Sequence, residues 1–146
     1  MATTALELVV PADPAYLELV GQVVTFVAMR MGFADRDAAR IRLAVDEACA
    51  NVVSHATPDG APYRVVCEEQ GERLVVRVQD AGPVFDLEAF ANPNLDVPLE
   101  KRQVGGLGLY LMRRVMDSVE LMARDDGKEL VLSKVLPRPE ETADGD

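Results

Sequence analysis

The stretch "RLAVDEACANVVSHA", Arg42 to Ala56, decides how the rest of the chain is interpreted. Its apolar residues recur every three or four positions, which predicts an amphipathic helix. Glu47 and Asn51 interrupt the apolar run and, lying four residues apart, share one helix face. A solvated surface would explain this pair, and so would a carboxylate and a carboxamide that line a cleft. The core face is expected to carry Ile41, Ala44, Val45, Ala48 and Val52.

Working outward, the pattern predicts further helices and five strands. The expected strands are Thr4 to Val10, Tyr63 to Glu69, Arg73 to Asp80, Val119 to Arg124 and Glu129 to Val135. The expected helices run from Pro14 to about Gly32, from Asp35 to about Ala56 and from Leu107 to Met116, with a short one at Asp86 to Phe90. Strands joined mostly by hairpins indicate an α+β fold. We expect a two-layer α/β sandwich with a mixed, mainly antiparallel sheet and helices on one face.

Local signals refine the helices. Asp13 followed by Pro14 is typical of an N-cap and a first helical residue. Asp35 is expected to cap the second long helix in the same way. In the last helix, Leu107, Leu111 and Val115 are expected to share one apolar stripe.

Composition favours one folded domain. The chain has 146 residues, of which 49% are hydrophobic, and a formal net charge of −10. Such a hydrophobic fraction supports a core, whereas the negative charge argues against nonspecific binding to nucleic acid or to anionic membranes. We expect a domain at residues 1–136 and a disordered acidic tail at residues 137–146.

The two cysteines, Cys49 and Cys67, are not in a C-x-x-C pair and accompany a single histidine. A zinc site is therefore not expected. We expect instead two buried thiols in a reducing compartment. The N-terminal "MATTALELVV" lacks the basic region and the apolar length of a signal peptide. No stretch approaches the 18 apolar residues of a membrane span. These features predict a cytoplasmic protein.

Two further patches carry chemistry. In "VQDAGPVFD", Asp80 ends a strand and Gly82 follows two residues later. This is either an ordinary turn or a carboxylate that accepts from an exocyclic amine beside a glycine that admits a flat ring. In "GGLGLYLMRR", Gly105, Gly106 and Gly108 precede or open a helix, where free N–H groups suit a phosphate. A glycine inside a helix is unfavourable, so Gly108 requires either close approach of a phosphate or tight helix packing.

Taken together, Glu-x₃-Asn on a helix, Asp-x-Gly after a strand, a long loop and G-x-G at a helix start resemble the ATP-binding (Bergerat) domain of the GHKL, or histidine-kinase-like, superfamily. Within it, "LAVDEACANVVSHA", "VQDAGPVFD" and "GGLGLYLMRRVMDSVE" are similar to the anti-sigma-factor serine/threonine kinases of bacterial partner-switching systems. The resemblance covers roughly residues 5 to 136.

The resemblance implies a role for each patch. Asn51 would hold Mg²⁺ and Glu47 would be the general base, while Asp80 would read the adenine amine with Gly82 beside the ring. The phosphates of ATP would lie against Gly105, Gly106, Leu107 and Gly108, under an ATP lid at about Asn92 to Val104. Lys101 and Arg102 in that lid would approach the terminal phosphates, or are simply solvated cations. His55 matches a position where the family often has histidine, and a structural hydrogen bond is expected of it.

The implied function is an ATP-dependent protein serine/threonine kinase that phosphorylates an anti-sigma-factor antagonist and sequesters a sigma factor. A homodimer is expected from the resemblance, without direct contact to nucleic acid or membrane. The alternatives are a sequestration module with the same fold but no kinase activity, and a detached histidine-kinase catalytic domain.

Two positions depart from the pattern. Val84 stands where the superfamily often has a second glycine, and Gly127 is followed by Lys128 and Glu129 instead of threonine. The missing hydroxyl brings ATP affinity into question and favours the sequestration module, whereas the presence of Glu47, Asn51 and Asp80 favours the kinase.

Overall fold

The structure, a computed structural model, describes residues 4–56, 61–85, 87 and 106–138. Its strands form one sheet in the order β1-β2-β3-β5-β4. They are β1 (Thr4–Val10), β2 (Tyr63–Gln70), β3 (Arg73–Asp80), β4 (Ser118–Arg124) and β5 (Gly127–Val135). All four pairings are antiparallel, so the mixed sheet that we expected has no parallel pair among the described strands.

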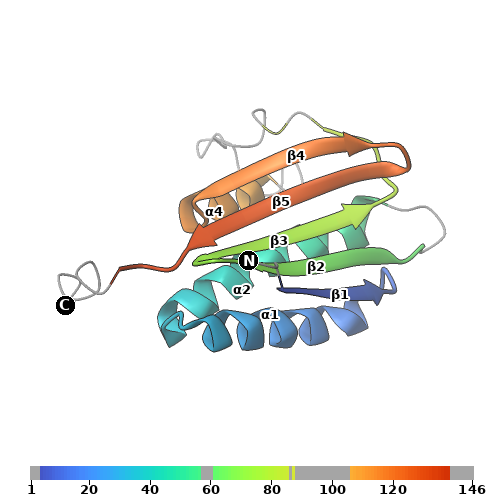
Figure 1. Cartoon of the computed structure of the whole chain (residues 1–146). Helices are drawn as coiled ribbons and strands as arrows, with labels where there is room; N and C mark the ends of the chain where they lie inside the picture. Colours follow the sequence, from blue (N-terminus) through green and yellow to red (C-terminus); the bar gives the residue numbers. More distant parts are fainter. Residues whose placement is uncertain (1–3, 57–60, 86, 88–105, 139–146) are drawn as a thin grey trace.

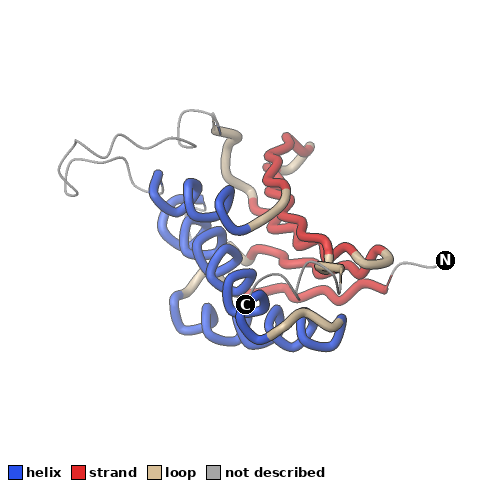
Figure 2. The backbone as a smooth tube through the Cα atoms, turned by 90° about the vertical axis from the view of Figure 1, so that its left-hand side faces the viewer, coloured by secondary structure: helices blue, strands red, loops and turns tan. Residues whose placement is uncertain are grey.

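The helices cover one face of this sheet. They are α1 (Leu17–Met31), α2 (Asp35–Asn51) and α4 (Gly106–Val115), with a short 3₁₀ helix η1 (Pro14–Tyr16) and a π-helix η2 (Val52–Ala56). Figures 1 and 2 show α1, α2 and α4 side by side on one side of the strands. The predicted α+β two-layer sandwich is therefore confirmed. The expected tail lies almost wholly outside the described residues, and of the expected short helix only Leu87 is described.

The helix ends follow local chemistry, with one correction. Asp13 caps η1, because its carboxylate accepts from the Ala15 N–H at 2.9 Å. Gly32 ends α1 in the left-handed region, with φ of 111°. The prediction for Asp35 was wrong: Asp35 is the first helical residue, and the N-cap Ala34 makes no side-chain capping bond. An acidic residue in the first turn still stabilises α2 through the helix dipole.

The core lies between the sheet and the helices. The five residues predicted to form the core face of α2 are all buried. In α4 the fully buried residues are Leu109 and Met112, and the following turn buries Met116, whereas Leu111 and Val115 of the predicted stripe are partly buried. This helix is thus turned so that the Leu109–Met112 face meets the sheet and α2.

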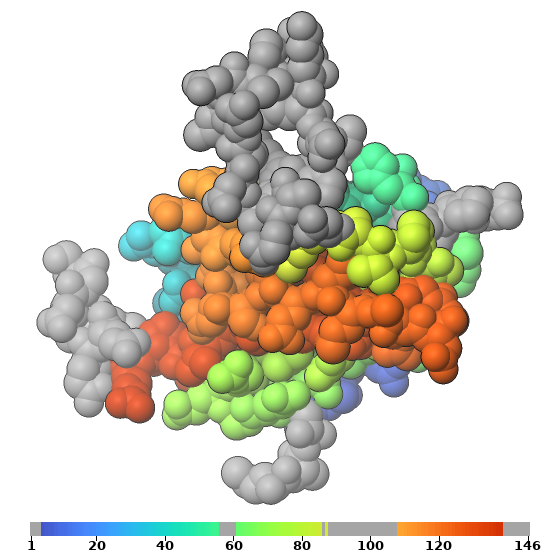
Figure 3. Space-filling view, turned by 90° about the horizontal axis from the view of Figure 1, so that it is seen from above, coloured from blue at the N-terminus to red at the C-terminus, as the bar shows by residue number. Residues whose placement is uncertain are grey.

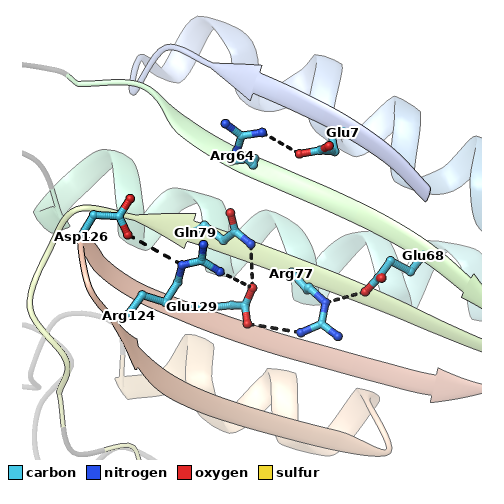
Figure 4. A network of polar contacts seen from close by, with 8 residues as sticks. All are labelled: Glu7, Arg64, Glu68, Arg77, Gln79, Arg124, Asp126 and Glu129. Atoms are coloured by element: carbon cyan, nitrogen blue, oxygen red, sulfur yellow. Dashed lines mark hydrogen bonds and ion pairs between the residues drawn. The ribbon is translucent and has the colours of Figure 1, made fainter.

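None of the described helices covers the outer face of the sheet, which carries charged side chains (Figure 4). Glu129 is central to them, because its carboxylate accepts from Arg77 and Arg124, each at 3.2 Å, and from Gln79 at 2.7 Å. Arg77 also pairs with Glu68. These side chains surround the buried valines of that face, Val66, Val75 and Val131. The patches predicted to bind ATP lie on the opposite, helix-covered side.

Candidate active site

Helix α2 holds Glu47 and Asn51 on one face, and both side chains are partly buried. This face meets the first turn of α4. A Cβ atom added to Gly108 would lie 2.7 Å from Glu47 Oε2 and 3.5 Å from Glu47 Cβ. Of the two reasons considered for a helical glycine at 108, the structure supplies tight packing against Glu47.

The amino-terminal end of α4 is therefore beside the Glu47 carboxylate. The helix begins at Gly106, one residue before the predicted start at Leu107, and the N–H groups of its first turn have no partners within the helix. These N–H groups and the positive end of the helix dipole favour an anion. Gly105, Lys101, Arg102 and the predicted lid at Asn92 to Val104 lie outside the described residues. The backbone of Leu107 is helical.

Asn51 is the last α-helical residue of α2, and the chain continues as the π-helix η2. The prediction of one regular helix to Ala56 therefore needs this correction. A π-turn is wider than an α-turn and occurs frequently at functional sites. His55, for which we expected a structural hydrogen bond, is exposed, and its side chain has no hydrogen-bond partner among the described residues.

Asp80 ends β3 on the helix-covered side of the sheet, and its side chain is 2% exposed. Its Oδ1 accepts from the Gly82 N–H at 2.7 Å and from Lys128 Nζ, also at 2.7 Å. Asp80 and Lys128 are directly opposite each other in the β3–β5 pairing. The sequence had shown only that a hydroxyl is missing at 128, whereas the structure places an ammonium group on the carboxylate.

Gly127 makes this pairing possible. Its φ is +148°, and a Cβ atom there would lie 1.9 Å from the Asp80 carbonyl oxygen. Only glycine allows β5 to start so close to the end of β3. In Figure 3 the segment after β3 (yellow-green) lies beside the β4–β5 hairpin (orange to red).

The structure thus forms two groups of predicted residues on one side of the sheet. Glu47 meets Gly108 at one, and Asp80 meets Gly82 at the other. A cavity of about 210 Å³ lies at the Asp80 end of β3, where Asp80 and Ala81 line it together with Val9, Arg64 and Gln79. No residue of α2 or α4 lines this cavity. The cavity therefore adjoins the group formed by Asp80 and Gly82 but not the group formed by Glu47 and Gly108.

The two cysteines are free and buried, as predicted. Burial raises the pKa of the Cys49 thiol to about 12 and that of Cys67 to about 11. Both thiols are therefore neutral at physiological pH and poor metal ligands. Within the described ranges, no group of three or more His, Cys, Asp or Glu side chains is placed to hold a metal ion.

Comparison with known proteins identifies the family. Residues 10–134 match the histidine kinase-like ATPase domain. The chain belongs to this family. ATP binding is what membership implies, and the GHKL resemblance drawn from the three patches is confirmed.

Curated relatives narrow the family further. The chain is 35% identical over 139 residues to the serine-protein kinase RsbW of Halalkalibacterium halodurans, covering 92% of this chain and 85% of the relative. It is 33% identical over 145 residues to the RsbW kinase of Bacillus cereus, covering 96% and 90%. The chain is thus a member of the RsbW-type serine-protein kinases, and the predicted enzyme class is confirmed.

Solved structures support the fold. A Mycobacterium tuberculosis protein with RsbU and RsbW domains matches with a TM-score of 0.69 at 18% identity, over 93% of this chain and 33% of that one. The SiaB–SiaC complex of Pseudomonas aeruginosa contains a match with a TM-score of 0.58 at 18% identity, over 90% and 89%. In the part of the chain that is described, no helix has the length and apolar character to cross a membrane.

Proposed function

We propose that this protein transfers the terminal phosphoryl group of ATP to a serine or threonine of an anti-sigma-factor antagonist, and that it also sequesters a sigma factor. One observation carries the kinase assignment: Glu47 and Asn51 share a face of α2 against which the amino-terminal turn of α4 packs through Gly108. A carboxylate, a carboxamide and an anion-favouring helix end are thereby gathered at one place. The identity to serine-protein kinases supports the assignment.

The residues present fit Mg²⁺ better than other common metals. Mg²⁺ takes oxygen ligands, needs few from the protein and accepts the rest from phosphates and water. The Asn51 carboxamide supplies one such oxygen beside the helix end at which we place the phosphates. When bound, the ion would neutralise charge on the phosphates.

Glu47 is the proposed general base. It accepts the proton of the attacking hydroxyl, whose oxygen bonds to the terminal phosphorus as the bond from that phosphorus to the bridging oxygen of ADP breaks. The first-turn N–H groups of α4, at Gly106, Leu107 and Gly108, hold phosphate oxygens during this step. Gly105, Lys101 and Arg102 remain predicted contributors to phosphate binding, within or next to the predicted lid.

Asp80 is the proposed adenine reader. Its buried carboxylate is fixed by the Gly82 N–H, and the bend at Gly82 leaves a face without a side chain for the ring. The exocyclic amine of adenine would donate to Asp80, which gives the site its preference for this base.

The proposed partners are proteins. We place the reaction in the cytoplasm, where ATP and sigma factors occur, and propose that a homodimer carries it out. A net charge of −10 opposes direct contact with nucleic acid.

A phosphotransfer assay with native partners tests the proposal. The antagonist and sigma factor are first identified by co-purification and mass spectrometry, and transfer of labelled phosphate is then measured for wild type and Glu47→Gln. We expect Glu47→Gln to lose about 10²–10⁴-fold in rate and to retain its fold and its partners. Glu120→Gln, which neutralises an exposed carboxylate on β4, is the control and should retain full activity. A Glu47→Gln variant as fast as wild type would remove the base assignment.

The sequestration module remains the second candidate, because position 128, where a hydroxyl is common in the family, holds a lysine that donates to the Asp80 carboxylate. It becomes the better description if wild type transfers no phosphate but still retains its sigma factor.

A further inference from the structure

The Asp80–Lys128 pair is the feature that the family pattern does not explain. The Lys128 side chain is 10% exposed and that of Asp80 is 2% exposed, with 2.7 Å between Nζ and Oδ1. The ammonium also lies 6.0 Å from the centroid of the Phe85 ring, within the range of a cation–π contact. The Lys128 ammonium therefore lies near both a carboxylate and an aromatic ring.

Stability alone is a weak reason for such a pair. Removing two charges from water is unfavourable, and well-packed apolar residues often replace a buried ion pair without loss of stability. The neighbours of Asp80 and Lys128 along their strands, Val78 and Leu130, show that this part of the sheet accepts apolar side chains. A buried charge pair at the end of two strands, next to a proposed ligand site, calls for a functional reason.

Among the described residues, the hydrogen bonds of Asp80 and Lys128 leave one carboxylate oxygen and two ammonium N–H groups available to a ligand. Both bonds to Asp80 end on Oδ1, and none from the described residues reaches Oδ2. An ammonium group has three N–H donors and no acceptor, and one donor of Lys128 goes to Asp80. The pair therefore offers an acceptor, Oδ2, and beside it a group that can only donate.

We infer that Lys128 reads the nucleobase directly, donating a hydrogen bond to ring nitrogen N1 of adenine while Asp80 Oδ2 accepts from the exocyclic amine. This inference rests on the proposed ATP site and extends it. The edge of adenine carries a donor, the amine, next to an acceptor, N1, so it complements the acceptor and donor of the pair.

The ammonium makes this requirement stricter than a hydroxyl would. A hydroxyl at 128 can donate or accept, so it tolerates a base with either N1 or N1–H at that point. Lys128 cannot accept. Hypoxanthine in the same position presents a carbonyl to the Asp80 carboxylate and an N1–H to the ammonium, which are two repulsive contacts. Lys128 therefore selects adenine over 6-oxopurines.

Nucleotide analogues test this with the unaltered protein. Calorimetry would compare ATP, 1-deaza-ATP, in which C–H replaces N1, and ITP, all with Mg²⁺. We expect 1-deaza-ATP to bind at least about tenfold more weakly than ATP, the loss of one hydrogen bond to a charged group. ITP should bind about 10²-fold more weakly or worse, because both contacts are lost. Equal binding of ATP and 1-deaza-ATP would overturn the inference, as would equal binding of ATP and ITP.

Variants assign the effect to one side chain. Lys128→Met removes the donor. The affinities of this variant for ATP and for 1-deaza-ATP should therefore lie within about twofold of each other, instead of differing about tenfold as in wild type. Lys134→Met is the matched control: Lys134 lies on the same face of β5 and donates to the Val115 carbonyl at 2.9 Å, and its loss should leave the tenfold ratio unchanged. Persistence of the ratio in Lys128→Met, or tighter binding of ATP than in wild type, would show that Lys128 does not read N1.

The outcomes separate this inference from the function on which it rests. If wild type binds no ATP at millimolar concentration, the ATP site itself is wrong and the inference falls with it. If ATP binds without discrimination against 1-deaza-ATP, only the role of Lys128 is wrong. If Lys128→Met does not fold, because Asp80 is left buried and unpaired, the comparison of analogues with wild type still decides.

Discussion

Replacing Gly108 by alanine should misplace the proposed base without unfolding the protein. The new Cβ atom would be 2.7 Å from Glu47 Oε2, whereas ordinary contacts begin at 3.4 Å, so the carboxylate must move by about 0.7 Å. The Glu47 side chain can rotate, which costs about 1 kcal/mol, while alanine is favoured over glycine in a helix by about 1 kcal/mol. The free energy of unfolding should therefore change by less than about 1 kcal/mol.

The catalytic effect should be larger than the effect on stability. A shift of this size in a reacting group reduces the rate by about 10²-fold. Initial rates of phosphotransfer at saturating ATP measure this loss, and calorimetry of ATP binding and urea unfolding are run in parallel. We expect a lower rate together with ATP affinity within about threefold of wild type, because the change acts on Glu47 and leaves the nucleotide contacts in place.

A second background isolates the contact. In Glu47→Ala the carboxylate is absent and only the Glu47 Cβ remains, 3.5 Å from the position of the new methyl group. Adding Gly108→Ala to that variant should therefore reduce the residual rate no further. The reasoning is refuted if Gly108→Ala transfers phosphate at the wild-type rate. It is also refuted if ATP binding falls equally in both backgrounds, because Gly108 would then be needed for close approach of a phosphate rather than for the position of Glu47.

Three further outcomes are expected. Asn51→Ala should abolish the increase in ATP affinity that Mg²⁺ gives to wild type, measured by titration with and without the ion; an unchanged increase would show that Asn51 is not a ligand. Gly127→Ala should lower the free energy of unfolding by about 2–4 kcal/mol, since φ is +148° and the added Cβ would overlap the Asp80 carbonyl oxygen; a loss below about 1 kcal/mol in urea unfolding would contradict this. Cys49 and Cys67, whose pKa values burial raises from the ordinary 9.0 to about 12 and about 11, should resist thiolate-specific reagents while the protein is folded. Above pH 9.0 the unfolded chain loses these protons and the native protein keeps them, so the free energy of unfolding should fall as the pH rises. Rapid labelling of the folded protein at pH 9, or a free energy of unfolding that stays constant above pH 9.0, would contradict this prediction.

Features encoded in neighbouring residues could be predicted from the sequence alone. The core face of α2 follows from helical periodicity, so Ile41 and Val45 were placed correctly. Asp13 and Pro14 mark the start of η1 because their capping geometry is local. Alternating apolar residues and short turns determined the hairpins and hence the two-layer sandwich, and the order of the three patches pointed to the family. Each of these depends on interactions between residues close in the chain.

Contacts between distant segments were decided only by the tertiary structure. The close contact of Gly108 with Glu47 joins α4 to α2, and the burial of Leu109 and Met112 follows from how α4 packs on α2 and the sheet, which no local periodicity encodes. Asp80 and Lys128 are 48 residues apart and meet because the register of β3 against β5 places them opposite each other. A shift of one residue in that register would turn the ammonium to the outer face of the sheet. The sequence could show that a hydroxyl was missing at 128; only the packed sheet, with Gly127 against the Asp80 backbone, shows what takes its place.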